Sequence, residues 1–410
     1  MKFIILGDIH IGKSIRLGKP PSGQTGLNSR IQDQLDLLDW VLKQAVDNYV
    51  KAIIITGDVY EDPRPHPTFI NFFMLWLKKC EKEGVQVHVI AGNHDIIRSG
   101  LYTVSALDIV SSVEMLGAKI YKNVDTLNFE GVSITLLPYR DRRMYEVETT
   151  EEALEILKKE YMPQLDRIPA GNKRVLVGHL ALEGSIRIGD EIDDELNEIF
   201  CPSHVFKDWD YTWMGHVHNP QIMHDIAKNE PYYVAHIGSM ERSDFSKHEM
   251  LGRKFIVLFD SEKSGPGIYE EIDLPNRPIH KVEITVPKGK DTTDFVINNL
   301  NFFNEENSLK NAIINLEIKL APDVQNVDRQ KITEYLYEKI GAHYICYFSE
   351  SRFVDTIVVD SDSIIDNSMT PEASINIFWD NVDDIDDTDR EECRVLSHEI
   401  NKEFEERFGK

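Results

Sequence analysis

The stretch MKFIILGDIHIGK, residues 1–13, decides how the rest of the chain is interpreted. Its apolar run from Phe3 to Leu6 predicts a buried strand, and Gly7 predicts the turn that ends it. Asp8 and His10 follow two residues apart, so on an extended segment their side chains point to the same side. Because a carboxylate and an imidazole placed this way can bind one metal ion, they form a candidate ligand pair.

Similar strand ends recur downstream, each an apolar run followed by oxygen or imidazole donors. They place Asp58 after AIIITG, Asn93, His94 and Asp95 after VQVHVIAG, His179 after RVLVG, and His216 and His218 after YTWMG. In open α/β sheets, ligands bind at the carboxyl ends of the strands, where such loops converge. Any one of these residues alone would be ordinary turn or core chemistry. The ordered set D-x-H, GD, GNHD, GH and GHxH therefore predicts one shared site.

The residue types in this set fit a site for two divalent metal ions. Two ions about 3.5–4 Å apart can bind both the attacking and the leaving oxygen of a phosphoester displacement. Asp58 suits the carboxylate that bridges both ions, and His94, held by Asp95, suits a free imidazole for proton transfer. The terminal ligand positions are assigned to Asp8, His10, Asn93, His179, His216 and His218.

The first loop also satisfies a competing motif, because GDIHIGKS at residues 7–14 matches the phosphate-binding P-loop pattern. That motif needs small residues whose amides wrap a phosphate, and a helix that starts at the lysine. Here Ile9 and Ile11 are bulky, and Pro20 and Pro21 prevent a helix soon afterwards. The metal-site interpretation is therefore preferred to nucleotide binding.

The composition predicts a soluble, cytoplasmic protein with more than one domain. A chain of 410 residues exceeds the usual size of a single core. No apolar run is long enough to span a membrane, and the first strand is too short for a secretion signal. The four cysteines are scattered without a CxxC pair, which favours reduced thiols over a disulfide framework or a zinc ribbon.

The net charge of −25 disfavours a nucleic-acid partner at face value, because affinity for DNA comes largely from lysine and arginine on phosphates. The charge is uneven, however. Residues 361–410 hold 15 acidic and 5 basic residues, whereas residues 11–31 contain no acid. A local basic patch beside the metal site is therefore predicted. The candidate DNA contacts are Lys13, Arg16, Lys19, Arg30 and Arg64.

The hydrophobic periodicity predicts an α/β fold built as a four-layer α/β/β/α sandwich. Helices are expected over 29–50, 67–80, 103–110 and 150–161, strands over 52–56, 85–90, 119–121, 175–177 and 211–214, and a hairpin over 126–138. Segments 231–245 and 254–260 are expected to close a second sheet. Helix 67–80 is apolar nearly all round, so burial is favoured, with a subunit contact as the alternative.

Composition shifts divide the chain into four parts. We predict a core over 1–270, a small α+β capping domain over 280–360 that also binds DNA, a linker over 361–370 and a helical tail over 371–410. The capping domain is expected to form a β-α-β-α-β unit with helices near 292–303 and 328–340. The tail should form two short helices, one over 370–382 that begins with the capping Thr370 and Pro371, and a second over 386–408. Since such helices bury little alone, a partner protein is expected, with a helical pair folded back on the body as the alternative. The candidate partner contacts are Ile375, Phe378, Trp379, Val395 and Leu396.

With these residues in place, the chain resembles the calcineurin-like metallophosphoesterases over about residues 1–260. It has GDVYED and GNHD where the serine/threonine phosphatase branch has GDxxDRG and GNHE. LPYR at 137–140 and GSMERSDF at 238–245 are similar to segments of the SbcD-type nuclease subunits of double-strand-break repair complexes, relatives of the eukaryotic meiotic-recombination nuclease. This resemblance implies exonuclease and endonuclease activity on DNA ends in repair and recombination.

The resemblance also implies roles for individual residues. Asp8, His10, Asp58 and His218 would hold one metal ion, usually manganese with magnesium as the alternative, and Asp58, Asn93, His179 and His216 would hold the second. His94 would act on the phosphate, oriented by Asp95. The tail would dock on the coiled-coil base of an SMC-like ATPase of the SbcC type. The nuclease would form a homodimer, with Phe69, Phe72, Phe73 and Trp76 as candidates for the dimer face.

One departure from the resembled family limits what carries over. Many members have a histidine three residues after the bridging aspartate, where this chain has Glu61, so the balance between exonuclease and endonuclease activity is left open. The short capping domain and acidic tail also suit a viral version. The alternatives are a dinuclear phosphodiesterase or phosphatase acting on a small molecule or phosphoprotein, and a non-catalytic scaffold that recruits the ATPase.

Overall fold

The computed structural model describes most of the chain. The described residues are 1–21, 26–99, 102–112, 117–187, 197–225, 232–322, 324–352, 375–376, 378–379 and 387–408. They fall into two compact units. One comprises Met1–Val282, Leu300–Leu316 and Gln330–Phe348, and the other comprises Glu283–Asn299, Glu317–Arg329 and Ser349–Lys410. The four-part division expected from composition stays a prediction.

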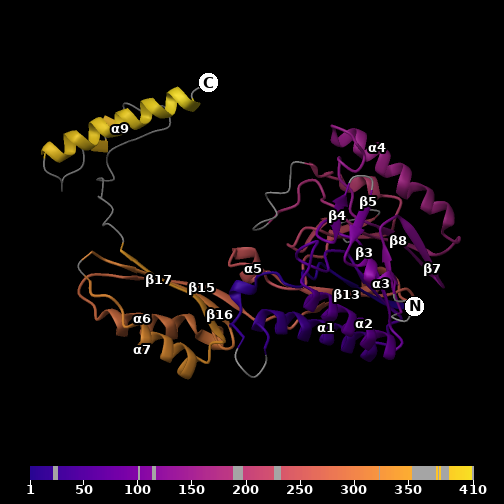
Figure 1. The fold of residues 1–410 in the computed structure, drawn as a ribbon, viewed down its shortest axis with the longest axis horizontal. Helices are drawn as coiled ribbons and strands as arrows, with labels where there is room; N and C mark the ends of the chain where they lie inside the picture. The colour runs from indigo at the N-terminus through magenta and orange to yellow at the C-terminus, as the bar shows by residue number, and fades with distance from the viewer. Residues whose placement is uncertain are drawn as a thin grey trace. The chain divides into compact units, whose positions relative to one another are not determined.

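The first sheet is built around the N-terminal strand (Figure 1). Its six strands, in the order β14-β13-β1-β2-β3-β6, are Tyr269–Asp273, Phe255–Asp260, Lys2–Leu6, Ala52–Ile55, Gln86–Ile90 and Ala118–Tyr121. Strands β1, β2, β3 and β6 are parallel, and β13 pairs antiparallel with β1. The expectation that residues 254–260 close the second sheet is wrong. Strand β13 joins the first sheet, where Phe259 lies opposite Phe3 with their rings stacked at 4.8 Å.

The second sheet also has six strands, with the order β11-β12-β10-β9-β8-β7. These are Gln221–His224, Tyr233–His236, Tyr211–Gly215, Lys173–His179, Val132–Leu137 and Asp125–Phe129. The four central strands β12, β10, β9 and β8 are parallel, and an antiparallel strand lies at each edge. The predicted hairpin is β7 and β8, and the segment from residue 231 supplies β12 as expected.

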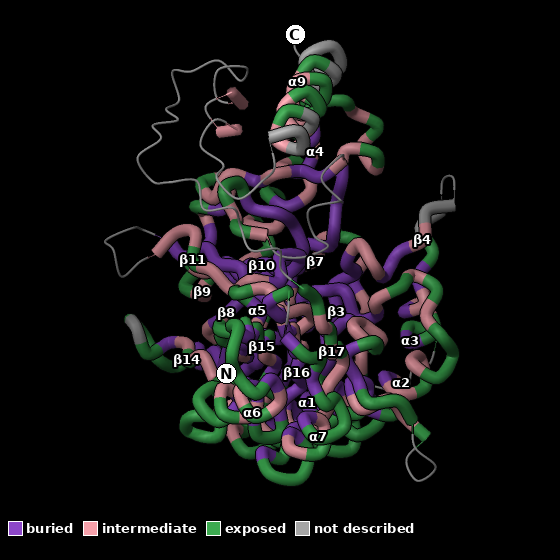
Figure 2. The backbone as a smooth tube through the Cα atoms, turned by 90° about the vertical axis from the view of Figure 1, so that its left-hand side faces the viewer, coloured by how far each residue is buried: buried purple, intermediate pink, exposed green. Residues whose placement is uncertain are grey.

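The side chains of β1 show how the layers arise. Phe3 and Ile5 belong to the core between the two sheets, whereas Ile4 and Leu6 belong to the core beneath the helices. Strand residues alternate between faces, so one apolar run serves both layers. Helices α1 (Ser29–Asp47) and α2 (Pro67–Lys82) cover the first sheet, and α4 (Thr150–Tyr161) covers the second. The predicted α/β/β/α sandwich is confirmed, and its strands form the buried interior (Figure 2).

Helix α2 is buried on one face only. Phe73 and Trp76 pack in the core of their own chain, so they are not available for the dimer face assigned to them. Phe69 and Phe72 are half-buried, and Leu75 is 47% exposed. Complete burial of the helix is therefore wrong, because the 3.6-residue repeat turns part of its apolar surface outward.

The segment expected to be a helix over 103–110 is a strand followed by a short helix. Strands β4 (Ile96–Ser99) and β5 (Tyr102–Ser105) form an antiparallel hairpin, and α3 begins only at Asp108 and ends at Ser112. Ile97 lies opposite Val104 in this hairpin. Branched residues at these positions favour the strand, and the cross-strand pairing outweighs the weak helical pattern.

The predicted β-α-β-α-β unit is present as β15 (Ile279–Val286), α6 (Thr292–Phe303), β16 (Ile313–Leu320), α7 (Arg329–Glu334) and β17 (Tyr344–Arg352). The strand order is β15-β16-β17. The helix expected over 328–340 is shorter, because after α7 the chain continues as a π-helical turn over Tyr335–Ile340. The remaining short elements are α5 (Lys247–Leu251) and 3₁₀ turns at Ile15–Leu17, Met162–Arg167, Ser203–Phe206, Gly265–Gly267 and Glu305–Asn307.

The tail contains one long helix, α9 (Asp387–Phe408). Residues 375–376 and 378–379 are helical too, whereas Thr370 and Pro371 lie outside the described residues. The Trp379 side chain donates a hydrogen bond to Ser397 Oγ at 3.0 Å, so the two helical segments of the tail contact each other. Among the described helices, none is both long and apolar enough to cross a membrane. All four cysteines are free thiols.

Candidate metal centre

The strand ends of both sheets bring the predicted ligands together. Asp8 and His10 follow β1, Asp58 follows β2, Asn93 follows β3, His179 ends β9, and His216 and His218 follow β10. All of them except the half-buried Asn93 are buried. Two groups have ligand atoms within 4.8 Å of one another, namely Asp8, His10 and His218, and Asp58, His179 and His216. The carboxyl ends of parallel strands therefore meet here as predicted.

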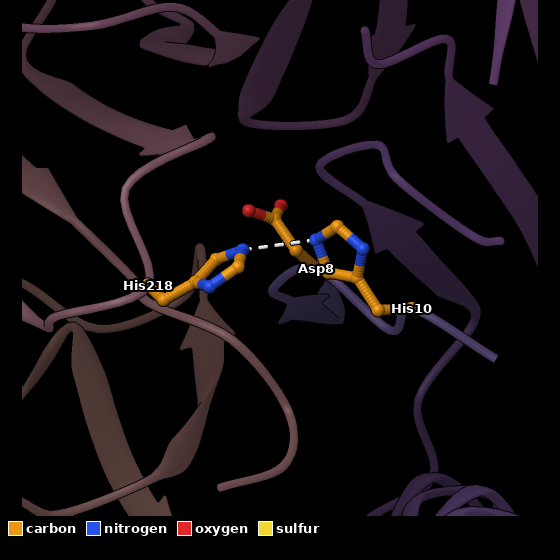
Figure 3. Close-up of side chains that lie close together, drawn as sticks. All are labelled: Asp8, His10 and His218. Atoms are coloured by element: carbon orange, nitrogen blue, oxygen red, sulfur yellow. Dashed lines mark hydrogen bonds between the residues drawn. The ribbon is translucent and has the colours of Figure 1, made fainter. Parts of the chain in front are cut away.

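In the first group, two imidazoles face each other across a short gap. His10 Nε2 lies 2.9 Å from His218 Nε2, beside the Asp8 carboxylate (Figure 3). Burial lowers the pKa of His10 to about 3 and lowers the pKa of His218 well below its usual value, so both rings are neutral and offer lone pairs. Asp8 is fixed by hydrogen bonds from Thr56 Oγ1 at 2.9 Å and from the backbone N–H of His216 at 2.7 Å.

Asp58 lies between the two groups. Its Oδ2 atom is 3.5 Å from His10 Nε2 and 3.3 Å from His179 Nε2. Its Oδ1 atom accepts a hydrogen bond from the backbone N–H of His94 at 2.9 Å. Burial opposes ionisation, yet the charges of His179 and His94 hold the pKa of Asp58 well below its ordinary range. This position and charge suit a carboxylate shared by two cations.

The second group is completed by an amide oxygen. Asn93 Oδ1 is 2.9 Å from His179 Nε2 and 3.0 Å from His216 Nδ1. The pKa of His179 is raised to about 9 although burial alone would lower it, because the carboxylates of Asp58 and Asp8 flank the ring. The centre therefore carries a negative field that favours cations.

The histidines also have the outer contacts typical of metal ligands. A ligating histidine usually presents one ring nitrogen to the metal and binds an acceptor with the other. Three rings here have one nitrogen in the centre and the other within hydrogen-bond distance of an acceptor. The pairs are His10 Nδ1 with Glu61 Oε2 at 2.8 Å, His179 Nδ1 with the Thr56 carbonyl at 2.9 Å, and His216 Nε2 with Glu198 Oε1 at 3.0 Å. The residues present therefore fit two divalent ions.

The glycines of the strand-end motifs make room for the ligands. A Cβ atom at Gly92 would lie 2.1 Å from Asp58 Oδ1, and one at Gly215 would lie 2.3 Å from Asp8 Oδ1. Any larger residue at either position would therefore push a predicted ligand out of place. This explains why a glycine precedes Asn93 and His216 in the sequence.

Three of the predicted ligands have strained backbones. His10, Asp58 and His216 have φ angles of 50°, 47° and 79°, in the left-handed region that residues other than glycine rarely adopt. Each such residue costs on the order of 1–3 kcal/mol and persists only where its surroundings fix it. Strain of this kind concentrates at functional sites, which agrees with the prediction that these three residues are metal ligands.

His94 lies beside the two groups with one ring nitrogen engaged. Its Nδ1 atom is 2.7 Å from the backbone carbonyl of Glu61, which leaves Nε2 as the nitrogen able to reach a substrate. Burial lowers the pKa of His94, but the Asp58 carboxylate, the Glu61 carbonyl and the Glu61 carboxylate together more than offset this, so the pKa is raised.

Asp95 has a different role from the one predicted. Its Oδ1 atom accepts the Val59 N–H at 2.9 Å, its Oδ2 atom accepts the Gly92 N–H at 3.0 Å, and burial raises its pKa to about 7. Asp95 thus ties the loop after β2 to the loop after β3. The His94 ring is held by the Glu61 carbonyl, so the expected orientation of His94 by Asp95 is wrong.

Sequence reasoning missed several residues that support the ligands. Glu61 and Glu198 contact the ligand histidines, and Lys254 Nζ donates to the His218 carbonyl at 2.9 Å. Glu61 carried a signal, because it stands where the resembled nucleases have a histidine. Glu198 and Lys254 lie in segments without a motif, so no local pattern could have identified them.

One predicted DNA contact is wrong. Arg30 is 1% exposed, and its guanidinium lies 3.1 Å from Asp33 and 3.2 Å from Glu241, so no phosphate can reach it. Lys13 Nζ lies 3.4 Å from both carboxylate oxygens of Glu61. Arg16, Lys19 and Arg64 are exposed and stay predictions.

The chain is similar to several known proteins. The model of the calcineurin-like phosphoesterase family matches residues 1–220. The DNA double-strand break repair protein Mre11 of Methanopyrus kandleri is 25% identical over 299 residues, covering 70% of this chain and 60% of its own length. A subunit of the SbcCD nuclease of Staphylococcus epidermidis is 23% identical over 299 residues, covering 69% of this chain and 72% of its own length. A dimetal phosphatase structure from Danio rerio covers 63% of this chain and 91% of its own, with 13% identity and a TM-score of 0.39. The chain thus spans about 60% of the length of the archaeal relative.

Proposed function

Because the chain belongs to the calcineurin-like phosphoesterase family, we propose that it is a DNA nuclease that hydrolyses phosphodiester bonds with two divalent metal ions. The observation that carries this proposal is the position of Asp58, whose Oδ2 atom lies between the imidazoles of His10 and His179. The named relatives include a DNA double-strand break repair protein and a nuclease subunit, which supports DNA as the substrate. Exonuclease and endonuclease activity on DNA ends both belong to the proposal.

In this proposal the ligand residues divide between two metal positions. Asp8, His10, Asp58 and His218 hold one ion, and Asp58, Asn93, His179 and His216 hold the other. When bound, the ions, manganese or alternatively magnesium, activate water as Lewis acids and neutralise charge on the phosphate oxygens. The Asp58 carboxylate would serve both positions. Gly92 keeps the space beside Asp58 Oδ1 clear, because a Cβ atom there would lie 2.1 Å from it.

His94 supplies the proton for the leaving oxygen. The carbonyl of Glu61 holds Nδ1 at 2.7 Å, which fixes the ring and directs Nε2 to the substrate. The backbone N–H of His94 is bound to Asp58 Oδ1, so the acid and the bridging carboxylate keep one geometry. His94 belongs to neither ligand group built around Asp8 and Asp58, and its ring can therefore serve in proton transfer.

Replacing His94 with Ser tests this role. We expect both manganese sites to survive in calorimetry, while cleavage of single-stranded circular DNA falls by about 10²–10⁴-fold, the usual contribution of a positioned acid or base. His66→Ser is the matched control, because His66 is exposed, caps α2 by accepting the Thr68 N–H, and can be replaced in that cap by serine. Turnover retained by the His94 variant would remove it from the mechanism.

The substrate is decided by offering DNA and a small phosphodiester to the same preparation with manganese. The proposal predicts cutting of the DNA circle. Hydrolysis of the small ester alone, both with and without the ATPase partner, would favour the alternative of a phosphodiesterase or phosphatase acting on a small molecule or phosphoprotein. Absence of any turnover would favour a scaffold.

The proposal includes an SMC-like coiled-coil ATPase as partner of the tail, and a homodimer of the nuclease. Leu396 and Ile400 on α9 are 55% and 59% exposed and lie four residues apart, so they share one helix face. Val395 is also exposed, whereas Ile375, Phe378 and Trp379 are half-buried. The exposed apolar face of α9 suits a coiled-coil surface.

Replacing Leu396 and Ile400 together with Asp should abolish binding to the purified coiled-coil fragment of the ATPase. Each buried apolar side chain contributes about 1.5–3 kcal/mol, so the pair accounts for a loss of at least about 100-fold in affinity. Glu399→Ala, at an exposed position between them, is the control. Undiminished affinity of the double variant would exclude this face of the tail.

A further inference from the structure

We infer that Glu61 is a positioning residue for two imidazoles of the centre: its carboxylate orients the predicted ligand His10, and its backbone carbonyl orients the acid His94. This inference rests on the proposed metal centre. It assigns a role to a position where many of the resembled nucleases carry a histidine and this chain carries an acid.

The side chain of Glu61 fixes which nitrogen of His10 is available. Glu61 Oε2 lies 2.8 Å from His10 Nδ1, the ring nitrogen that faces away from the ligand group. His10 Nε2 then faces His218 at 2.9 Å and Asp58 at 3.5 Å. A carboxylate on Nδ1 selects the tautomer with its lone pair on Nε2 and makes that nitrogen a better donor to a metal.

The backbone of Glu61 fixes the second imidazole. Its carbonyl lies 2.7 Å from His94 Nδ1, and the rings of His10 and His94 meet edge to face at 4.9 Å. The two imidazoles are therefore held against each other by one residue.

The loop that carries Glu61 is itself anchored to the loop that carries His10. The Glu61 N–H donates to the Ile11 carbonyl at 3.3 Å, and Ile11 forms a parallel bridge with Tyr60. A shift of Glu61 would thus move His10 and His94 together. The contact with His10 is therefore part of a fixed frame rather than an accidental surface pairing.

Direct ligation by Glu61 is the competing role, because ligand atoms of His10, Glu61 and His94 also lie within 4.8 Å of one another. Two contacts favour positioning instead. Glu61 Oε2 faces the outer nitrogen of His10, and His94 Nδ1 is occupied by the Glu61 carbonyl. Lys13 Nζ lies 3.4 Å from the Glu61 carboxylate and balances its negative charge. The Glu61 side chain is 33% exposed.

Manganese calorimetry on Glu61→Ala and Glu61→Gln separates these roles. Loss of an outer partner typically weakens metal affinity by about 10–100-fold, so the alanine variant should weaken one of two manganese sites by that amount. The glutamine variant should stay near wild type, because its amide oxygen can still accept from His10 Nδ1. Asp62→Ala is the matched control, since Asp62 is exposed and binds the Arg64 N–H instead. Saturating manganese should restore cleavage by the alanine variant, because the carbonyl that holds His94 remains.

Equal manganese affinity in wild type and Glu61→Ala would overturn the inference and leave the proposed function intact. A glutamine variant as weak as the alanine variant would also overturn it, in favour of direct ligation by the carboxylate. If Glu61→Ala does not fold, Glu61→Asp gives the same test, because its shorter side chain cannot reach Nδ1. Failure of the wild-type chain to bind two manganese ions would instead refute the metal centre on which the inference rests.

Discussion

Replacing Asp58 with Asn is expected to remove both manganese sites and to lower DNA cleavage by at least about 10³-fold. Asp58 Oδ2 is the one carboxylate oxygen among the described residues that lies within 3.5 Å of imidazoles from both groups, so both metal positions share it. A neutral amide offers a single weak oxygen ligand in its place. The loss corresponds to several kcal/mol of transition-state stabilisation, the range attributed to a catalytic metal ion.

The fold should survive this change, which makes the result interpretable. An asparagine Oδ1 can still accept the His94 N–H that Asp58 accepts at 2.9 Å. Asp62→Asn is the matched control, because Asp62 is exposed and lies further along the same loop. Calorimetry that still finds two manganese sites in the Asp58 variant would contradict the bridging assignment.

Replacing Lys254 with Met is expected to lower the free energy of unfolding by about 3–5 kcal/mol. Lys254 and Glu249 are 3% and 0% exposed, and their charged groups lie 2.7 Å apart. Removal of the lysine leaves the Glu249 carboxylate buried without its cation, at a place where burial already raises its pKa. Urea denaturation measures the loss.

The same substitution should weaken the first metal position. Lys254 Nζ donates to the His218 carbonyl at 2.9 Å and to Ser239 Oγ at 2.8 Å, so it holds the loop that presents a ligand. Lys158→Met is the control, because its ion pair with Glu155 is exposed to solvent and contributes little to stability. If Lys254→Met lowers the free energy of unfolding no more than Lys158→Met does, the prediction is refuted. A Lys254→Met, Glu249→Leu double variant should recover much of the stability, since neither buried charge then remains.

The ligand set could be predicted because its signals are local. A strand that ends in glycine and then a carboxylate, amide or imidazole can be recognised within a few residues, and parallel strands bring such ends together. The sandwich layers follow from the same kind of pattern. Phe3 and Ile5 pack in the core between the sheets, and Ile4 and Leu6 pack in the core beneath the helices. A continuous apolar run therefore already indicates a strand that is buried on both faces.

Three of the errors have a different physical cause, which is contact with residues that the local pattern does not show. Strand β13 pairs with β1 although the two lie at opposite ends of the core sequence, and its apolar pattern would suit either sheet. Arg30 lies at the end of the acid-free stretch 11–31, but Glu241 reaches it from far along the sequence. Asp95 directly follows His94, yet its oxygens bind the amides of Val59 and Gly92. The predictions for these residues relied on residues adjacent in sequence. The observed contacts come from residues that are close in space instead.

The centre itself is tested most directly by electron paramagnetic resonance of the chain loaded with two equivalents of manganese. Two ions about 3.5–4 Å apart with a shared carboxylate are coupled magnetically. We therefore predict the signal of a spin-coupled pair in the wild-type chain and its disappearance in the Asp58→Asn variant. A spectrum of isolated manganese ions alone, or a coupled signal that survives loss of the Asp58 carboxylate, would contradict the dinuclear centre.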